Sequence, residues 1–177
     1  MTQTYLFTHT SLLGRIKMKK FIVALFSVVA LFMFMGTGAF AAENDHAEIL
    51  QKIEETNVEI EEEIQAAQAK GDKLLSALSL ETAKLDAKLE TAQQNGTSEA
   101  DIAKLEKEVK TKKAELTAKY NTDLDKLIDD LIDKTNKMTA DMIEEAAKEG
   151  IQAECSWVYV QIADRWVWVD PIKIIGP

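Results

Sequence analysis

The sequence predicts a mainly α-helical protein: a long antiparallel helical hairpin of coiled-coil type, followed by a small C-terminal β-hairpin. Three observations support this fold class. After Ala42 the chain is rich in Glu, Lys, Ala, Leu and Ile and has no proline before Pro171, a composition typical of long helices. The turn pair Asn95-Gly96 interrupts the helical pattern near its middle. The last residues alternate between aromatic and β-branched types, which indicates strands.

The first helical segment covers residues 45–94. Its apolar stripe advances by three or four residues at each step, with a period of about 3.5, the repeat of a left-handed supercoil. The stripe consists of Leu50, Ile53, Asn57, Ile60, Ile64, Ala67, Gly71, Leu74, Leu78, Glu81 and Leu85. Asn57 interrupts it as a polar residue that could fix the register of the helices. Gly71 is followed by Asp72, which favours a kink at residue 71.

The second helical segment covers residues 99–149. Ser98 is suited to cap it, with Asp101 three residues on, so the turn lies near residues 95–98. The apolar stripe from Ile102 to Met142 has a period of about 3.6, that of a nearly straight helix. Gly150 stands where a helix C-cap belongs. A short loop between two helices of equal length predicts antiparallel neighbours, so residues 42–150 form one helical hairpin.

Further apolar residues flank this seam and would widen it beyond what a lone two-helix hairpin can bury. They are Ile49, Leu75, Leu89, Ile128, Ile132 and Ile143. Two arrangements would cover them: self-association through the helices, or a helix that folds back at Gly71. We favour self-association.

The N-terminal residues 1–41 have the pattern of a secretory signal peptide. The basic run Lys17-Met18-Lys19-Lys20 precedes an apolar run from Phe21 to Met35, and Ala39-Phe40-Ala41 provides a cleavage site after Ala41. Met18 would be a natural start, which would leave residues 1–17 upstream of the true beginning. The alternative is an uncleaved anchor, because the apolar stretch is long enough to span a bilayer. Either case predicts a bacterial-type protein that is secreted or associated with the cell envelope.

The charge excludes one class of partner. The residues after Ala41 carry all 30 acidic residues of the chain and 17 of its 21 basic ones, a net charge of −13. Such a chain repels nucleic acid, and it would meet a membrane only through an uncleaved signal segment. The acidic residues of 59–63 and 129–133 could be imagined as a divalent-cation site. We interpret them as a solvated acidic face, since no calcium-binding loop motif is present.

Catalytic chemistry has no support in the sequence. After residue 41 the chain has a single histidine, His46, and a single cysteine, Cys155, so neither a catalytic triad nor a His/Cys metal site can be assembled from them. No phosphate-binding glycine loop is present. We therefore expect no enzyme activity, no catalytic residues, no metal and no cofactor.

The C-terminal module, residues 151–177, contains every tryptophan of the chain. Pairing Ile162 with Arg165 sets Val160 opposite Val167 and gives the β-hairpin an aliphatic face. The other face then carries the candidate ligand surface, made of Trp157, Tyr159, Trp166 and Trp168. Two alternatives follow. As a cap, the module would bury Trp166 and Trp168 against the helix ends; as a site, it would expose them. We favour the cap, with a short third strand at Ile172, Ile174 and Ile175.

The run Trp166-Val167-Trp168-Val169 resembles the strands of bacterial SH3-like cell-wall modules, over this hairpin alone, and the resemblance assigns no residue a role. The leading functional hypothesis is a non-enzymatic exported structural or interaction protein, a helical spacer that carries a small aromatic β module. The alternative is a cell-envelope ligand-binding protein that uses the aromatic hairpin as its site. The expected partner is a cell-wall component or another protein.

Overall fold

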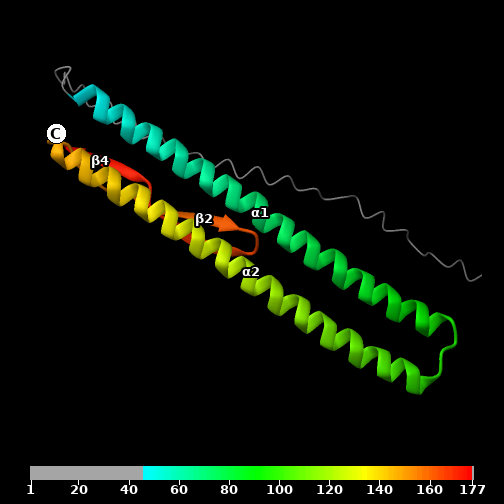
Figure 1. The fold of residues 1–177 in the computed structure, drawn as a ribbon. Helices are drawn as coiled ribbons and strands as arrows, with labels where there is room; N and C mark the ends of the chain where they lie inside the picture. Colours follow the sequence, from blue (N-terminus) through cyan, green and yellow to red (C-terminus); the bar gives the residue numbers. More distant parts are fainter. Residues whose placement is uncertain (1–45, 177) are drawn as a thin grey trace, which may run out of the picture. The chain divides into compact units, whose positions relative to one another are not determined.

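The computed structural model describes residues 46–176, all of which belong to the unit that runs from Ala41 to Pro177. The signal segment predicted over residues 1–41 lies outside the described residues. Two long helices dominate the described chain: α1 (Ala47–Gln94) and α2 (Glu99–Lys148). They lie antiparallel and side by side (Figure 1). The predicted helical hairpin is therefore confirmed.

The two helices are joined and ended by the residues that the sequence suggested. Gly96 takes a positive φ of 69° in the connection, and the Ser98 hydroxyl caps α2 by accepting a hydrogen bond from the Asp101 backbone N–H at 3.3 Å. At the other end, Gly150 has a φ of 79°. The Ile151 N–H then returns to the Ala146 carbonyl at 2.9 Å. This bond is the signature of a Schellman C-cap, and it turns the chain back along the helices.

Four short strands follow α2: β1 (Gln152–Cys155), β2 (Val158–Ile162), β3 (Arg165–Val169) and β4 (Ile172–Gly176). They form two separate two-stranded antiparallel sheets, β2 with β3 and β1 with β4. The β2–β3 register pairs Ile162 with Arg165 and Val160 with Val167, as predicted. The expected third strand exists as β4, but it pairs with β1 rather than joining the hairpin. Strand β1 was not predicted.

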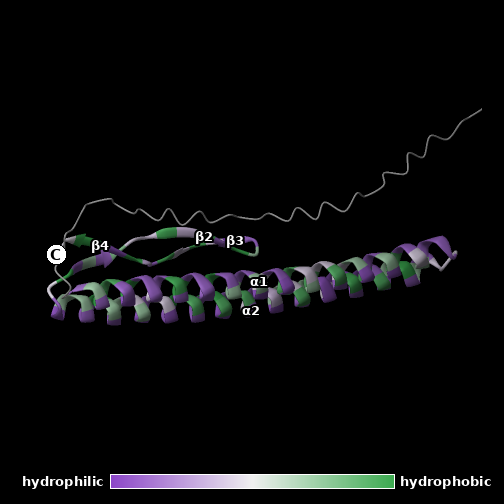
Figure 2. Ribbon diagram, turned by 90° about the horizontal axis from the view of Figure 1, so that it is seen from above, coloured by the Kyte–Doolittle hydropathy of each residue, from purple (hydrophilic) through white to green (hydrophobic). Residues whose placement is uncertain are grey.

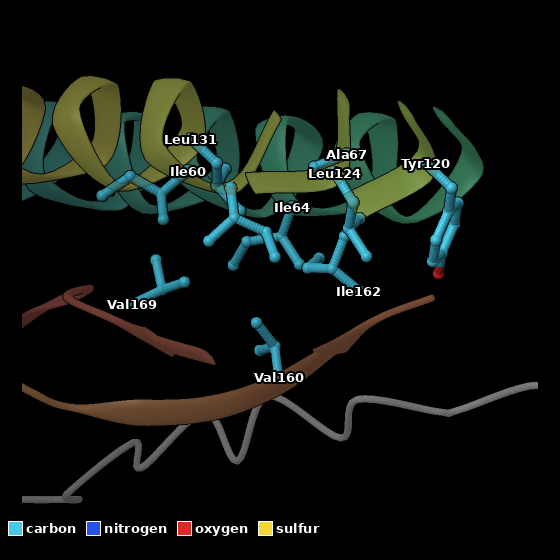
Figure 3. Close-up of a cluster of buried hydrophobic side chains, with 10 residues drawn as sticks. Ile60, Ile64, Ala67, Tyr120, Leu124, Leu131, Val160, Ile162 and Val169 are labelled. Carbon is cyan, nitrogen blue, oxygen red and sulfur yellow. The ribbon is translucent and has the colours of Figure 1, made fainter. Parts of the chain in front are cut away.

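The strands form a layer over one face of the helix pair, along the half that contains the start of α1 and the end of α2 (Figures 1 and 2). The larger of two apolar clusters lies between the two helices and strands β2 and β3 (Figure 3). Its buried members are Ile60, Ile64, Ala67, Tyr120, Leu124, Ile128, Leu131, Val160, Ile162 and Val169. The second cluster lies under β1 and β4, where Ile151 and Ile172 meet Ile49, Ile53, Met142 and Ala146.

In the half of the described hairpin beyond Gly71, the two helices pack only against each other. Val109 is buried in this distal half, whereas Leu78, Leu85 and Leu116 remain partly exposed on the narrow seam. The strand layer also covers two of the residues that flank the seam, Ile49 and Ile128, which are buried within this single chain. The width of the apolar stripe therefore does not by itself require a second copy.

Gly71 makes a close contact that the sequence did not suggest. Helix α1 is unbroken from Ala47 to Gln94, so the chain does not fold back at this glycine. Gly71 is buried under the β2–β3 turn, where an added Cβ would lie 3.1 Å from Ile162 Cγ2 and 3.3 Å from the Ala163 nitrogen. The absence of a side chain at Gly71 leaves room for the β-hairpin to approach the helix this closely.

Candidate binding surface

The β2–β3 turn fixes the orientation of the aromatic hairpin. Its two central residues are Ala163 and Asp164. Ala163 has a φ of 53°, the left-handed value that a type II′ turn requires at its first central position and that glycine usually supplies. An alanine held in this region costs about 1–2 kcal/mol and persists only where surrounding contacts impose it.

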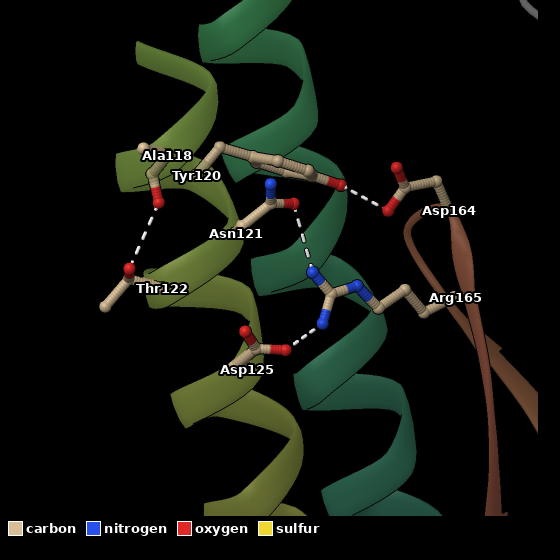
Figure 4. A network of polar contacts seen from close by, with 7 residues as sticks. All are labelled: Ala118, Tyr120, Asn121, Thr122, Asp125, Asp164 and Arg165. Carbon is tan, nitrogen blue, oxygen red and sulfur yellow. Dashed lines mark hydrogen bonds and ion pairs between the residues drawn. The ribbon is translucent and has the colours of Figure 1, made fainter. Parts of the chain in front are cut away.

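Those contacts come from α2. The Tyr120 hydroxyl donates a hydrogen bond of 2.6 Å to Asp164 Oδ1, and Arg165 pairs with Asp125 and donates to Asn121 Oδ1 (Figure 4). Burial and the Asp164 carboxylate together raise the pKa of Tyr120 to about 12, so this phenol stays a donor at all physiological pH values. Side chains of α2 thus hold the turn at two adjacent residues, Asp164 within the turn and Arg165 at the start of β3.

Helix α1 holds the other side of the hairpin. Gln68 Nε2 donates to the Gln161 carbonyl at 3.1 Å, beside the close contact at Gly71. With the hairpin fixed from both helices, the side chains of Val160, Ile162 and Val169 point into the cluster between strands and helices (Figure 3). The alternation of a strand then places the neighbouring side chains on the outer face.

That outer face is aromatic and open. Trp157 is 62% exposed, Tyr159 52%, Trp166 54% and Trp168 53%. The Tyr159 ring stacks on Trp166, with centroids 5.1 Å apart and planes 23° apart. It also contacts Trp168, with a centroid distance of 4.6 Å and a tilt of 34°. The structure therefore joins Tyr159, Trp166 and Trp168 in a continuous aromatic cluster. Trp157, the residue before β2, is exposed but takes no part in these ring contacts.

The expectation that Trp166 and Trp168 are buried is wrong. The hairpin does cap the helices, but it does so with its aliphatic face. The aliphatic face packs on the helices and the aromatic face stays exposed, because Gly71 admits Ile162 while Tyr120 and Gln68 anchor the hairpin.

The β1–β4 sheet lies beside this surface and contains the polar contact that the sequence did not reveal. Asn57 Nδ2 donates to the Ile172 carbonyl at 3.0 Å, and Asn57 Oδ1 accepts from the Ile172 N–H at 2.8 Å. Cys155, the direct partner of Ile172 in the register, is exposed and free. Asn57 therefore fixes the start of β4.

The acidic helices do not converge on an ion site. Within residues 46–176 no group of three His, Cys, Asp or Glu side chains is arranged to hold a metal ion. Lys134 pairs with Glu63 at 2.6 Å, between the two acidic stretches. Two open grooves lie between helix side chains, one of them lined by Lys70, Leu74 and Asp130. The exposed aromatic face is therefore the strongest candidate site in this part of the chain.

Comparisons with known proteins add no relative: no family model, curated protein or solved structure matches this chain. Among the described helices, neither is long and apolar enough to cross a membrane.

Proposed function

We propose that this chain is an exported, non-enzymatic interaction protein of the bacterial cell envelope, in which a helical spacer presents an aromatic β-hairpin to polysaccharide. The observation that supports the proposal most directly is the difference in burial between the two faces of the hairpin. Val160, Ile162 and Val169 are buried, whereas the aromatic cluster is more than half exposed. Large aromatic side chains grouped on an exposed face are unusual unless they bind something.

The chemistry of this face favours a sugar. The four aromatic residues carry no charge, in a chain that is otherwise strongly acidic. The faces of aromatic rings carry partial negative charge, so they attract the slightly positive C–H groups of a pyranose ring. The indole N–H and the tyrosine hydroxyl supply hydrogen bonds to sugar hydroxyls at the edge of the same surface. A neutral stacking surface also avoids the repulsion that the acidic helices exert on anionic ligands.

The helices support a presenting role rather than a catalytic one. Their distal half, from about residue 72 to residue 118, carries no strand layer and extends away from the aromatic hairpin (Figure 2). Many of their carboxylates lie on exposed faces, and the groove lined by Lys70, Leu74 and Asp130 is open to solvent.

Co-sedimentation with purified cell-wall sacculi tests the proposal. The native protein should sediment with the sacculi, and Trp166→Ala and Trp168→Ala should each lower the bound fraction severalfold. Leu80→Ala is the matched control, since Leu80 is equally exposed, at 58%, but lies on the distal part of α1. Circular dichroism on each variant verifies that the helices are retained.

The polysaccharide itself can be separated from attached peptides. Sacculi stripped of peptide by amidase should still bind, and soluble glycan fragments should change the tryptophan fluorescence. Binding that needs the peptide would favour a strand that pairs with the open edges of the hairpin instead. If the native protein and both tryptophan variants all remain in the supernatant, the glycan proposal fails and a spacer without a cell-wall ligand remains.

A further inference from the structure

The peptide bond between Asp170 and Pro171 lies in an unusual environment. Asp170 connects β3 to β4 and is 5% exposed, and Pro171 is buried as well. The residue before the pair, Val169, belongs to one apolar cluster, and the residue after it, Ile172, belongs to the other. An acidic side chain is therefore held where the two apolar clusters meet.

The Asp170 carboxyl group is poorly satisfied there. Its Oδ1 is fully buried and receives no hydrogen bond from any group within residues 46–176. Burial raises the pKa of Asp170 above the ordinary aspartate value, so the carboxyl group keeps its proton to a higher pH than usual. A buried polar atom without a partner costs free energy and calls for an explanation beyond stability.

The main-chain carbonyl group of Asp170, by contrast, has a hydrogen-bond donor. The hydroxyl of Thr139, itself buried on α2, donates a hydrogen bond to the Asp170 carbonyl oxygen. That oxygen belongs to the peptide bond with Pro171. The bond is a tertiary amide, whose nitrogen carries no hydrogen and becomes a basic amine once the carbonyl carbon turns tetrahedral.

We propose that the fold promotes cleavage of the Asp170–Pro171 peptide bond by the Asp170 side chain. A carboxyl oxygen attacks the main-chain carbonyl carbon of its own residue and forms a C–O bond in a five-membered ring. The carboxyl proton passes to the prolyl nitrogen, and the C–N bond breaks. The products of this step are a cyclic anhydride at Asp170 and a free secondary amine at Pro171. Water then opens the anhydride, so the net reaction is hydrolysis and no oxidant or reductant is required.

Each surrounding group has a defined part in this reaction. The nucleophile and the electrophile belong to one residue, so the first step is intramolecular and needs no water. The Thr139 hydroxyl already contacts the oxygen on which negative charge develops, as an oxyanion donor does. Burial of Asp170 raises the pKa of its carboxyl group, which favours the protonated side chain that can deliver a proton to the prolyl nitrogen.

The product peptide would begin at Pro171 and contain β4. It would remain attached at first, because Asn57 holds both backbone groups of Ile172 and β1 pairs with the strand. The cleavage would thus convert a covalent C-terminal strand into an exchangeable one.

Intact-mass measurements over several days test the proposal on the purified chain. The sample is kept at the lowest pH at which circular dichroism still shows the native helices, and a matched sample is kept in concentrated urea at the same pH. We expect the fragment beginning at Pro171 to form at least tenfold faster in the folded protein. A folded rate equal to or below the rate in urea would mean that the structure protects this bond, and the proposal would be wrong.

Variants of Asp170 and Thr139 test the roles proposed for the two side chains. Asp170→Asn should reduce the folded rate of cleavage to no more than the rate in urea. Thr139→Val should lower the folded rate by about a hundredfold, the lower end of the effect of losing one oxyanion donor. Thr139→Ser, which keeps the hydroxyl, should restore most of the rate and so separates chemistry from packing. The folded rate should also fall as the pH rises through the pKa of Asp170. If Thr139→Val and Thr139→Ser have the same rate as the native chain, the hydroxyl takes no part in the reaction and the proposed mechanism is overturned.

Discussion

The side-chain amide of Asn57 pairs with both backbone groups of Ile172, donating to its carbonyl at 3.0 Å and accepting from its N–H at 2.8 Å. One residue of α1 thereby takes the place of a neighbouring strand for the first residue of β4. The contact joins positions 115 residues apart in sequence. It closes the C-terminal strand layer onto the N-terminal part of the helical hairpin.

Replacing Asn57 with alanine should release β4. The variant leaves the N–H and the carbonyl of Ile172 without their partner in a partly buried position, which should lower the free energy of unfolding by about 1–3 kcal/mol. Hydrogen exchange should show faster exchange of the β4 amides, with the centre of the helices unchanged. Asn136→Ala is the control, since Asn136 is exposed on α2. Both variants replace Asn with Ala within a helix, so both gain the same helix propensity. Equal stability of the two variants would contradict the importance of this contact.

Gly71→Ala should destabilise the protein although alanine is the better helix former. The gain in helix propensity is about 1 kcal/mol. Against it, the new Cβ meets Ile162 Cγ2 at 3.1 Å and the backbone of Ala163 at 3.3 Å, in a turn that Tyr120 and Arg165 hold in place. Overpacking of this kind costs about 1–3 kcal/mol. We therefore expect a net loss of about 1 kcal/mol in a urea-denaturation measurement.

A double-mutant cycle checks the cause. Ala163→Gly removes the methyl group that faces Gly71 and relieves the positive φ of the turn. In that background Gly71→Ala should cost less than in the native chain. A cost that stays the same would place the strain somewhere other than the contact between α1 and the turn.

Tyr120→Phe should change how stability depends on alkaline pH. The folded pKa of Tyr120 is about 12, against 10.0 for an unperturbed tyrosine. Between these values the unfolded chain has lost the phenolic proton and the folded chain has kept it, so stability falls as the pH rises through this window. Tyr120→Phe should lose about 1 kcal/mol at neutral pH with the hydrogen bond to Asp164. It should then converge on the native chain between pH 10 and 12. Urea denaturation at neutral and alkaline pH measures both effects, and parallel curves would rule out the raised pKa.

The helices and the hairpin register were predictable because their signals are local. The apolar period, the cap at Ser98 and the Asn95-Gly96 turn each involve residues within a few positions of one another, and the alternation from Val158 to Val169 sets its own pairing. The contacts of Asn57 and Gly71 could not be predicted, for the opposite reason. Asn57 and Gly71 serve strands that follow about a hundred residues later, and a helical period carries no information about a third layer.

The candidate surface could be predicted in part. Alternation identified Trp157, Tyr159, Trp166 and Trp168 as one face, but it could not determine which face of the hairpin packs on the helices. That choice depends on a distant glycine that admits Ile162 and on Tyr120, which looks in sequence like an ordinary seam residue. Strand β1 gave no signal because Gln152, Ala153, Glu154 and Cys155 have no alternation, and the strand is defined by its partner β4.

The two faces of the hairpin should respond oppositely to truncation, although the larger residues lie on the outer one. Ile162 is fully buried among α1 and α2 side chains, and Ile162→Ala should lower the free energy of unfolding by about 2–5 kcal/mol through lost burial and a cavity. Trp166 is 54% exposed and stacks on Tyr159, so Trp166→Ala should cost about 1 kcal/mol, the value of one aromatic pair. In sacculus binding the order should invert at a temperature where both variants are folded: Trp166→Ala loses binding, and Ile162→Ala keeps it. If Trp166→Ala proves as destabilising as Ile162→Ala, the aromatic face is structural and the surface proposed for glycan binding is not a site.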